Sequence, residues 1–177
     1  MNLQLLPIGK LDDGLLLDLA PALENAFGVP CEIISKVLDP EFAFHAERQQ
    51  YHSSQLLNRM QTSFATGSWR VLGVTAVDLY IPILTFVFGE AQVGGPCAIV
   101  SFHRLRQEFY GLPANEDLLR GRLLKEAVHE LGHTFNLTHC DDYRCAMAPS
   151  HAVEWIDLKD SALCSTCELE TSREQAG

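Results

Sequence analysis

The sequence has no long apolar run, no basic region at its amino terminus and few positive charges. No stretch of the 177 residues approaches the roughly 18 apolar residues of a membrane-spanning helix. The opening segment, residues 1–7, contains no lysine or arginine, and its apolar run is shorter than that of a signal peptide. These absences argue against a membrane span and against export, so we expect a cytoplasmic protein with no membrane partner.

Positive charge is scarce, because 13 Lys and Arg residues stand against 23 Asp and Glu residues, for a formal net charge of -10. The basic residues are scattered, and we interpret them as solvated surface. Binding to a phosphate backbone requires a clustered basic footprint. We therefore expect no nucleic-acid partner, and we take a monomer as the default oligomeric state.

What the sequence does contain is an ordinary globular composition, with 47% hydrophobic and 20% charged residues. A chain of this length can enclose one proper core, and it shows no internal repeat or linker. We predict a single domain over residues 1–167. It comprises an N-terminal sheet and helix part (1–133) and a C-terminal part (134–167), followed by a flexible tail at 168–177.

Apolar periodicity predicts strands that alternate with helices, which is typical of an α/β or α+β domain built on a sheet. Strands are expected at residues 3–8, 31–38, 69–80, 86–88 and 97–102. Helices are expected from Asp12 or Asp13 to a stop at Gly28, from a Ser53 cap to about residue 64, and from an Asn115 cap through residue 137. A short helix is expected after residue 156, with Asp157 as its cap.

The segment that carries chemistry is a His-Glu-x-x-His pattern inside the predicted long helix, at His129, Glu130 and His133. Residues four apart stand on one face of a helix, about 6 Å apart along its axis. Two imidazoles so placed can reach one zinc ion at roughly 2.0–2.1 Å. Glu130 lies beside the first histidine, where it can act on water rather than bind the metal, so we predict it as the catalytic base.

A catalytic zinc needs a third protein ligand and one open position. His139, six residues after His133, is the candidate. Six residues of continuing helix rotate by about 600°, some 120° short of two turns, so the helix must end and the chain must turn back. Asn136 stands at this turn. Asparagine is, after glycine, the residue most tolerant of the left-handed conformation, so the turn is feasible.

Three histidines near a helix end can also be capping or surface groups, but this spacing together with the glutamate favours a metal site. The other histidines are isolated in the sequence, and we interpret each as a surface or hydrogen-bonded group. They are His45, His52, His103 and His151. Among them, His151 is the best placed for a role in the site.

Four cysteines form two close pairs, Cys140 with Cys145 and Cys164 with Cys167. Four thiolates suit a closed, tetrahedral, structural zinc site, and in a reducing compartment close cysteines are more often metal ligands than disulfides. The alternatives are four reduced core cysteines, or two disulfides after export. Because the segment has no long apolar run, metal binding would supply much of its folding energy. An ion at Cys140 would also hold the adjacent His139 in place.

These residues resemble the archaemetzincins, a metzincin subgroup with the pattern His-Glu-x-x-His-x-x-Gly-x-x-His-Cys-x4-Cys-x-Met and a later Cys-x-x-Cys. The matching residues are His129, Glu130, His133, His139, Cys140, Cys145, Met147, Cys164 and Cys167. Two features depart from the pattern. Asn136 replaces the glycine, which bears on the geometry of His139, and the spacer of 16 residues between Met147 and Cys164 is slightly short, which bears only on a loop.

The resemblance implies a metzincin-like zincin fold. Its parts are a twisted mixed β-sheet with an antiparallel edge strand, a long active-site helix and a small zinc-stapled C-terminal subdomain. It also implies that Met147 forms a Met-turn beneath the catalytic zinc, although a generic core methionine fits the same position. An edge strand can pair with an extended peptide, and we place it at 94–101. An ordinary paired strand is an equal alternative there.

We therefore predict a zinc metallopeptidase that acts on a peptide or protein substrate, as an aminopeptidase or an endopeptidase. Two zinc ions per chain are expected, one catalytic and one structural. Glu130 is expected to take a proton from the attacking water and deliver it to the leaving amine. Two alternatives stay open: a non-catalytic zinc protein that keeps only the cysteine-bound ion, and a zinc hydrolase for a non-peptide amide or a nucleotide.

Overall fold

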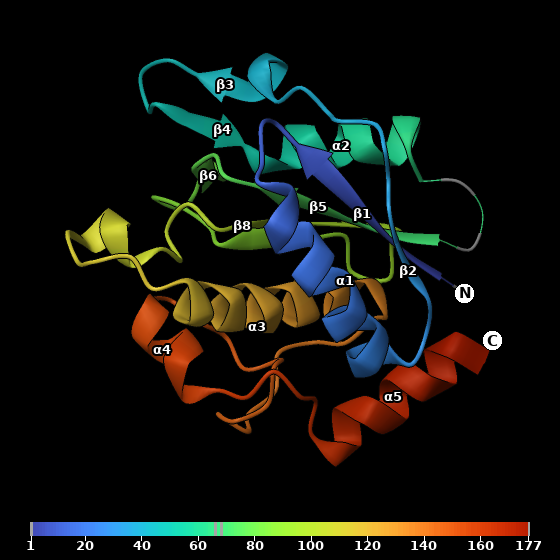
Figure 1. Cartoon of the computed structure of the whole chain (residues 1–177). Coiled ribbons are helices and arrows are strands. Elements are labelled where there is room, and N and C mark those ends of the chain that lie inside the picture. Colours follow the sequence, from blue (N-terminus) through green and yellow to red (C-terminus); the bar gives the residue numbers. More distant parts are fainter. Residues whose placement is uncertain (1, 66, 68, 177) are drawn as a thin grey trace.

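The computed structural model describes residues 2–65, 67 and 69–176 (Figure 1). Its main sheet has five strands in the order β2-β1-β5-β8-β7, all parallel except β7, which pairs antiparallel with β8. These strands are β1 Asn2–Ile8, β2 Cys31–Ile33, β5 Trp69–Thr75, β7 Gly89–Ala91 and β8 Cys97–Ser101. A smaller sheet, in the order β3-β4-β6, joins Phe44–His45, Gln50–His52 and Leu79–Tyr80.

Helices cover both faces of the main sheet (Figure 1). Helices α1 (Asp13–Phe27) and α3 (Glu116–Thr134) pack on one face, and α2 (Ser53–Ser63) packs on the other. Successive strand residues alternate between these two layers, as in Val71, which contacts the α2 side, and Leu72, which contacts the α1 and α3 side. Burial on both faces explains why the parallel strands read as continuous apolar runs in the sequence.

The predicted helix signals at two of these helices are confirmed. The Asp12 side chain accepts from the backbone of Gly14 at 2.9 Å, and α1 stops at Gly28, whose φ is 67°. The Asn115 side chain accepts from the Leu118 amide at 3.0 Å at the start of α3. These caps satisfy amides that have no partner inside the helix, so they fix where each helix begins.

Two other predicted caps are wrong. Ser53 is the first residue of α2 rather than its cap, and its hydroxyl bonds to the carboxylate of Glu90 and lies 3.1 Å from the Tyr80 carbonyl oxygen. The short helix α4 runs over Val153–Leu158, so Asp157 lies inside it, where it accepts two bonds from Arg122. In both cases a tertiary partner competes for the side chain that could have capped a helix.

The antiparallel edge strand is confirmed as a feature, but not at residues 94–101. The edge strand is β7, Gly89–Ala91, whereas Cys97–Ser101 forms β8, between β5 and β7. Every residue of β8 is buried, which is typical of an internal strand. The expected strand at 86–88 is a loop in which only Val87 forms a bridge, to Leu79.

The C-terminal part lies beyond α3, on the side away from the sheet, and holds α4 and α5 (Figure 1). The sequence predicted a flexible tail at 168–177, and the structure has a helix there as far as Ala176, since α5 spans Ser165–Ala176. The helix is held by a buried Thr171 and by Gln175, which donates to the Phe27 carbonyl at the end of α1, at 3.0 Å. These contacts, distant in sequence, are invisible in a polar segment taken alone.

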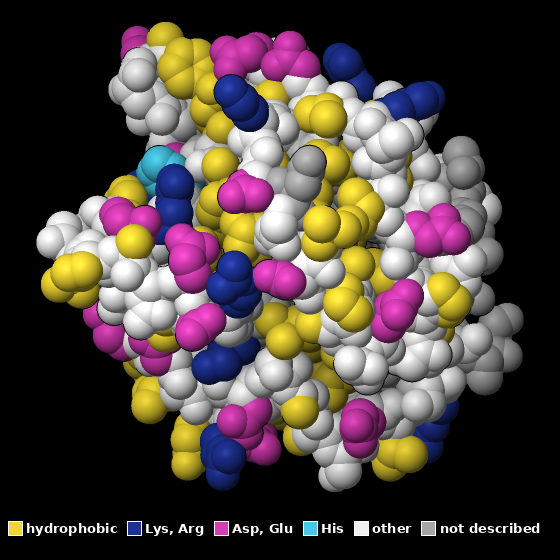
Figure 2. All heavy atoms as spheres, viewed as in Figure 1, with side chains coloured by type: hydrophobic (Ala, Val, Ile, Leu, Met, Phe, Trp, Pro, Cys, Tyr) yellow, Lys and Arg dark blue, Asp and Glu magenta, His cyan; other side chains and the backbone are white. Residues whose placement is uncertain are grey.

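Among the described helices, none combines the length and apolarity that crossing a bilayer requires. On the face drawn in Figure 2, Lys and Arg side chains are interspersed with Asp and Glu, so the described residues on that face form no continuous basic area.

Candidate active site and metal centres

The end of α3 turns the chain back toward its own helix. Asn136 has a φ of 67°, in the left-handed region, as predicted from its place in the sequence. Its amide donates to the His133 carbonyl at 3.0 Å, and the Leu137 amide donates to the Gly132 carbonyl at 3.1 Å. This pair of bonds is a Schellman motif, which satisfies the last carbonyls of the helix and reverses the chain.

The reversal brings His139 beside the two histidines of the helix. The nearest ligand atoms of His129, His133 and His139 all lie within 4.8 Å of one another. The Nδ1 atom of His129 lies 2.9 Å from the Ala146 carbonyl, and that of His133 lies 2.8 Å from the Leu137 carbonyl. Because a carbonyl oxygen only accepts, both Nδ1 atoms carry the proton and both Nε2 atoms present lone pairs.

This arrangement fits a zinc ion. The Nε2 atoms of His129 and His133 face each other at 3.2 Å, close to the ~3.3 Å expected between two nitrogens bound tetrahedrally to zinc at about 2.0–2.1 Å. Burial lowers the pKa of His129 to about 3 and also lowers the pKa of His133 and of His139. The rings are therefore neutral at physiological pH, which is the form that binds a metal.

Glu130 is buried in the same cleft, directly against the edge strand. A Cβ atom at Gly89 would lie 2.6 Å from Glu130 Cγ and 2.7 Å from its Oε1. Only a residue without a side chain leaves room for this carboxyl group. Burial raises the pKa of Glu130 well above its ordinary value, and the nearby Glu126 carboxylate raises it further.

Met147 lies against α3, the helix that carries His129 and His133. Its side chain is fully buried, and a Cβ atom at Gly132 would overlap its sulfur atom. Glycine at this helix position therefore lets the methionine approach the backbone between the two helical histidines. This position of Met147 agrees with the Met-turn beneath the histidines that the resemblance implies, and its role as a Met-turn stays a prediction.

The four cysteines form a second cluster, with all their sulfur atoms within 4.8 Å of one another. All four are free thiols. Cys140 Sγ and Cys164 Sγ are 3.8 Å apart, far beyond the ~2.05 Å of a disulfide but close to the separation of two thiolates on a tetrahedral zinc at about 2.3 Å. The Cys145 sulfur also accepts from the amide of Cys164, at 3.3 Å. The donor set therefore fits a closed zinc site.

The three histidines and Glu130 line an open cleft of about 630 Å³. Residues 81–88, here called the wall segment, form one side with mainly apolar side chains: Ile81, Leu84, Phe86 and Phe88. His151 lies on the lining together with Pro149 and Ser150. The interpretation of His151 as the best-placed isolated histidine agrees with this position.

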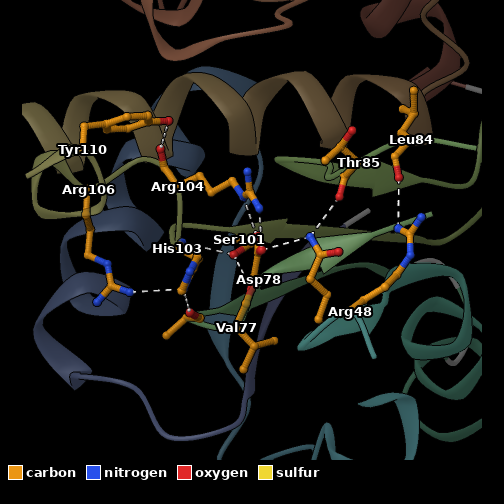
Figure 3. A network of polar contacts seen from close by, with 12 residues as sticks. Arg48, Val77, Asp78, Leu84, Thr85, Ser101, His103, Arg104, Arg106 and Tyr110 are labelled. Atoms are coloured by element: carbon orange, nitrogen blue, oxygen red, sulfur yellow. Dashed lines mark hydrogen bonds and ion pairs between the residues drawn. The ribbon is translucent and has the colours of Figure 1, made fainter. Parts of the chain in front are cut away.

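Figure 3 shows the polar network that holds the wall segment. Asp78 accepts two bonds from Arg104, each of 2.7 Å, and one from Gln50 at 2.9 Å. Gln50 also donates to the Thr85 carbonyl at 3.0 Å, and the Arg104 guanidinium lies 4.2 Å from the centre of the Phe86 ring. Gln50 and Arg104 therefore hold the wall segment directly, through a hydrogen bond and a cation–π contact, and the bidentate ion pair with Asp78 holds Arg104 in place.

Comparison with known proteins decides the family. A model of peptidase family M54 matches residues 13–173. The chain belongs to peptidase family M54. An archaemetzincin of Methanocaldococcus jannaschii is 43% identical over 167 residues, which cover 94% of this chain and 90% of the relative. An archaemetzincin of Thermococcus kodakarensis is 37% identical, over 96% of this chain and 94% of its own length.

Solved structures agree with this assignment. The archaemetzincin of Archaeoglobus fulgidus, crystallised with malonate, superposes with a TM-score of 0.83 at 32% identity, over 96% of this chain and 99% of its own. A zinc-dependent peptidase of Methanocorpusculum labreanum gives a TM-score of 0.84 at 30% identity, over 96% and 100%. This M54 chain is a zinc metallopeptidase, and both the archaemetzincin resemblance and the mixed α/β fold are confirmed.

The structure brings together the three histidines and Glu130 in one cluster and the four cysteines in another, with Met147 packed between them against Gly132 and Cys145. Sequence reasoning missed Gly89 and the wall segment. The signal for Gly89 was present, because a glycine next to a strand-forming run often marks a close approach of another group. The wall segment gave no such signal, since its apolar residues look like an ordinary buried strand.

The left-handed turn at Asn136 predicts opposite effects for two substitutions. Asn136→Ala should lower the free energy of unfolding by about 1–2 kcal/mol, because a Cβ without a polar partner is strained at positive φ. Asn136→Gly should preserve or raise it, since glycine has no such strain. Urea denaturation of the zinc-loaded protein measures both. Asn58→Ala, at an exposed position inside α2, is the matched control and should raise the free energy of unfolding by about 0.5 kcal/mol, because alanine favours a helix more than asparagine does. Equal stability of the alanine and glycine variants at 136 would contradict the argument.

The space at Gly89 predicts a specific defect in Gly89→Ala. The new Cβ atom would lie 2.6 Å from both Glu130 Cγ and the Ile99 carbonyl oxygen, and the Glu130 side chain can shift more readily than the backbone of β8. Small misplacements of a catalytic group can cost about 100-fold in rate, and Glu130 is the base predicted from the sequence. Peptidase activity should therefore fall at least tenfold while zinc content stays unchanged. Gly121→Ala, in α3 with open space around it, is the control and should keep full activity. A Gly89→Ala enzyme with wild-type kcat would show that Glu130 has room to spare.

Proposed function

We propose that this chain hydrolyses peptide bonds in the cleft, with Glu130 as the general base and with a zinc ion held by His129, His133 and His139. The observation that carries the proposal is the convergence of three neutral imidazoles within 4.8 Å, beside a buried carboxyl group in an open cleft. A zinc ion held there would act as a Lewis acid on the scissile carbonyl and make water acidic enough to attack at neutral pH.

The edge strand β7 suits an extended substrate. The Phe88 carbonyl accepts from Ser101 and the Gln92 amide donates to Cys97, so residues 88, 90 and 92 direct their backbone groups toward β8. In an antiparallel ladder, alternate residues direct these groups to opposite sides. Gly89 and Ala91 therefore point their amides and carbonyls away from β8, where a substrate backbone can pair with them as an added strand.

A substrate bound in this way passes close to Glu130, because Gly89 is the residue that adjoins the glutamate. In its ionised form the carboxylate takes a proton from the attacking water and then delivers it to the leaving amine. The burial of Glu130 excludes bulk solvent and keeps that proton in the cleft. The apolar wall segment would contact side chains that flank the scissile bond. Because pairing with β7 requires an extended backbone, the substrate is a peptide or an extended protein segment.

We further propose a second, structural zinc ion bound by Cys140, Cys145, Cys164 and Cys167. This ion would act on the catalytic site through the chain, because Cys140 directly follows His139 and its amide donates to the Met147 carbonyl at 3.0 Å. The cysteine cluster therefore fixes both the third histidine and the methionine beneath the site.

Glu130→Gln tests the proposed base. The variant should keep its zinc, since the amide is nearly the same size and the histidines are unchanged, but lose about 100- to 10,000-fold in kcat because no base remains. The assay is cleavage of a quenched-fluorescence peptide library, run beside small amides and nucleotides. Glu116→Gln, an exposed glutamate at the start of the same helix, is the control. Full turnover by Glu130→Gln would remove Glu130 from the mechanism.

Metal counting by elemental analysis tests the two zinc sites. We expect two zinc ions per wild-type chain, one in His139→Ala, and fewer than two in Cys164→Ser, with weakened binding at the histidines because His139 loses its anchor. A wild-type count of one that persists in His139→Ala would leave a structural zinc alone and favour a non-catalytic scaffold. If Cys164→Ser lowers the count by one with histidine-site affinity intact, the two sites are independent.

A further inference from the structure

Lys159 is a fully buried lysine that no part of the proposed reaction uses. It follows α4 directly, and only 2% of its surface is exposed. Its ammonium lies 2.8 Å from a Glu126 carboxylate oxygen and donates to the carbonyls of Ala146 and Ala148, each at 3.2 Å. The ammonium is therefore held by two hydrogen bonds to backbone carbonyls and by one close ion pair with a buried carboxylate.

The acceptors lie at places that matter for the histidine site. Ala146 and Ala148 flank Met147, so the ammonium holds the chain on both sides of the methionine. The Ala146 carbonyl also accepts from His129 Nδ1, at 2.9 Å. Glu126 lies on α3, one turn before Glu130 and His129. One charged group therefore ties the helix that carries His129 to the carbonyl that orients its ring.

Attachment of α4 to α3 does not by itself require this lysine. Arg122 already joins the two helices through Asp157, with bonds of 2.8 and 2.7 Å, and it also donates to the Leu105 carbonyl. Lys125 adds a further bond to the Ile156 carbonyl at 3.0 Å. A buried ion pair carries a desolvation penalty, so a second one placed directly beneath the histidines suggests a role in the site rather than in docking.

We infer that Lys159 is a positioning residue for His129, an inference that rests on the proposed zinc ligation. The Ala146 carbonyl keeps the proton of His129 on Nδ1 and aims its Nε2 atom at the point where the three rings meet. Lys159 fixes that carbonyl by anchoring it to Glu126. Groups that orient the ligands of a metal in this way typically contribute about 10- to 100-fold to metal affinity.

The test is zinc affinity of the double variant Glu126→Gln/Lys159→Met, which removes both charges and so leaves no unpaired buried ion. Titration with a chromophoric chelator resolves the two sites, and the step that His139→Ala abolishes belongs to the histidines. We expect that step to weaken about 10- to 100-fold, with the cysteine step unchanged. The matched control, Arg122→Met/Asp157→Asn, removes the other ion pair between the same segments and should leave both steps as in wild type.

Several outcomes would overturn the inference. Unchanged affinity in a folded Glu126→Gln/Lys159→Met protein would do so, and so would tighter binding, which would mean that the ammonium merely repels the cation. An equal loss in the Arg122 and Asp157 control would reduce Lys159 to general stability. If the first double variant fails to fold, Glu126→Gln/Lys159→Gln keeps a donor for the carbonyls and should give an intermediate loss. A wild-type protein without zinc at its histidines would instead refute the proposed function.

Discussion

Three imidazole rings meet at one point because the chain reverses immediately after the helix that carries two of them. His129 and His133 are held one turn apart by α3, but a continuing helix would carry the third ring away. The left-handed Asn136 and the two backbone bonds around it return the chain, so that His139 reaches the other rings. The segments that follow are placed by this reversal, since Cys140 comes next and bonds to the backbone of Met147.

The histidine site places polar side chains in the interior, which is otherwise apolar in a domain of this size. Glu126, His129, Glu130 and Lys159 are all buried, with Glu130 against the edge strand β7 and Lys159 in the C-terminal part. Burial raises the pKa of both Glu126 and Glu130, the Glu126 carboxylate raises the pKa of Glu130 further, and Lys159 lowers both. Buried ion pairs are weak contributors to stability, so a polar cluster of this kind is explained better by the chemistry of the cleft than by folding.

Spacing along the chain was sufficient to predict that the three histidines lie together and that the four cysteines lie together. A helix fixes the relation of His129 to His133, and the conformational tolerance of asparagine made the turn to His139 predictable. Local signals likewise located α1 and α3, because a cap depends on a few neighbouring residues. For the helix ends and the histidines, the prediction rested on interactions within about two turns of the chain, whereas the cysteines were predicted from two close pairs of metal-ligating residues.

What the sequence did not predict depends on contacts between distant segments. Glu130 needs the space left by Gly89, although the two residues are 41 positions apart in the sequence. Likewise, β7 is an edge strand because, in the main sheet, it pairs with β8 on one side only. The last helix, α5, is polar and gives no strong pattern of its own. It is held by contacts with the end of α1, as in the bond from Gln175 to Phe27. Such tertiary contacts override local preference, and a single sequence does not reveal them.

The two clusters are linked by a second path besides the peptide bond between His139 and Cys140. Cys145 precedes Ala146, whose carbonyl orients His129, and the Ala146 amide donates to Ala162, close to Cys164. The small core around Met147 consists largely of the sulfur-bearing residues Cys145 and Cys167 with Leu137. Because this core buries little apolar surface, it contributes little to the stability of the region. An ion bound by four thiolates would tie the two ends of the region together. On the proposed ligation, an ion at the cysteines would organise the histidine site, because it would fix the carbonyl and the third ring on which that site depends.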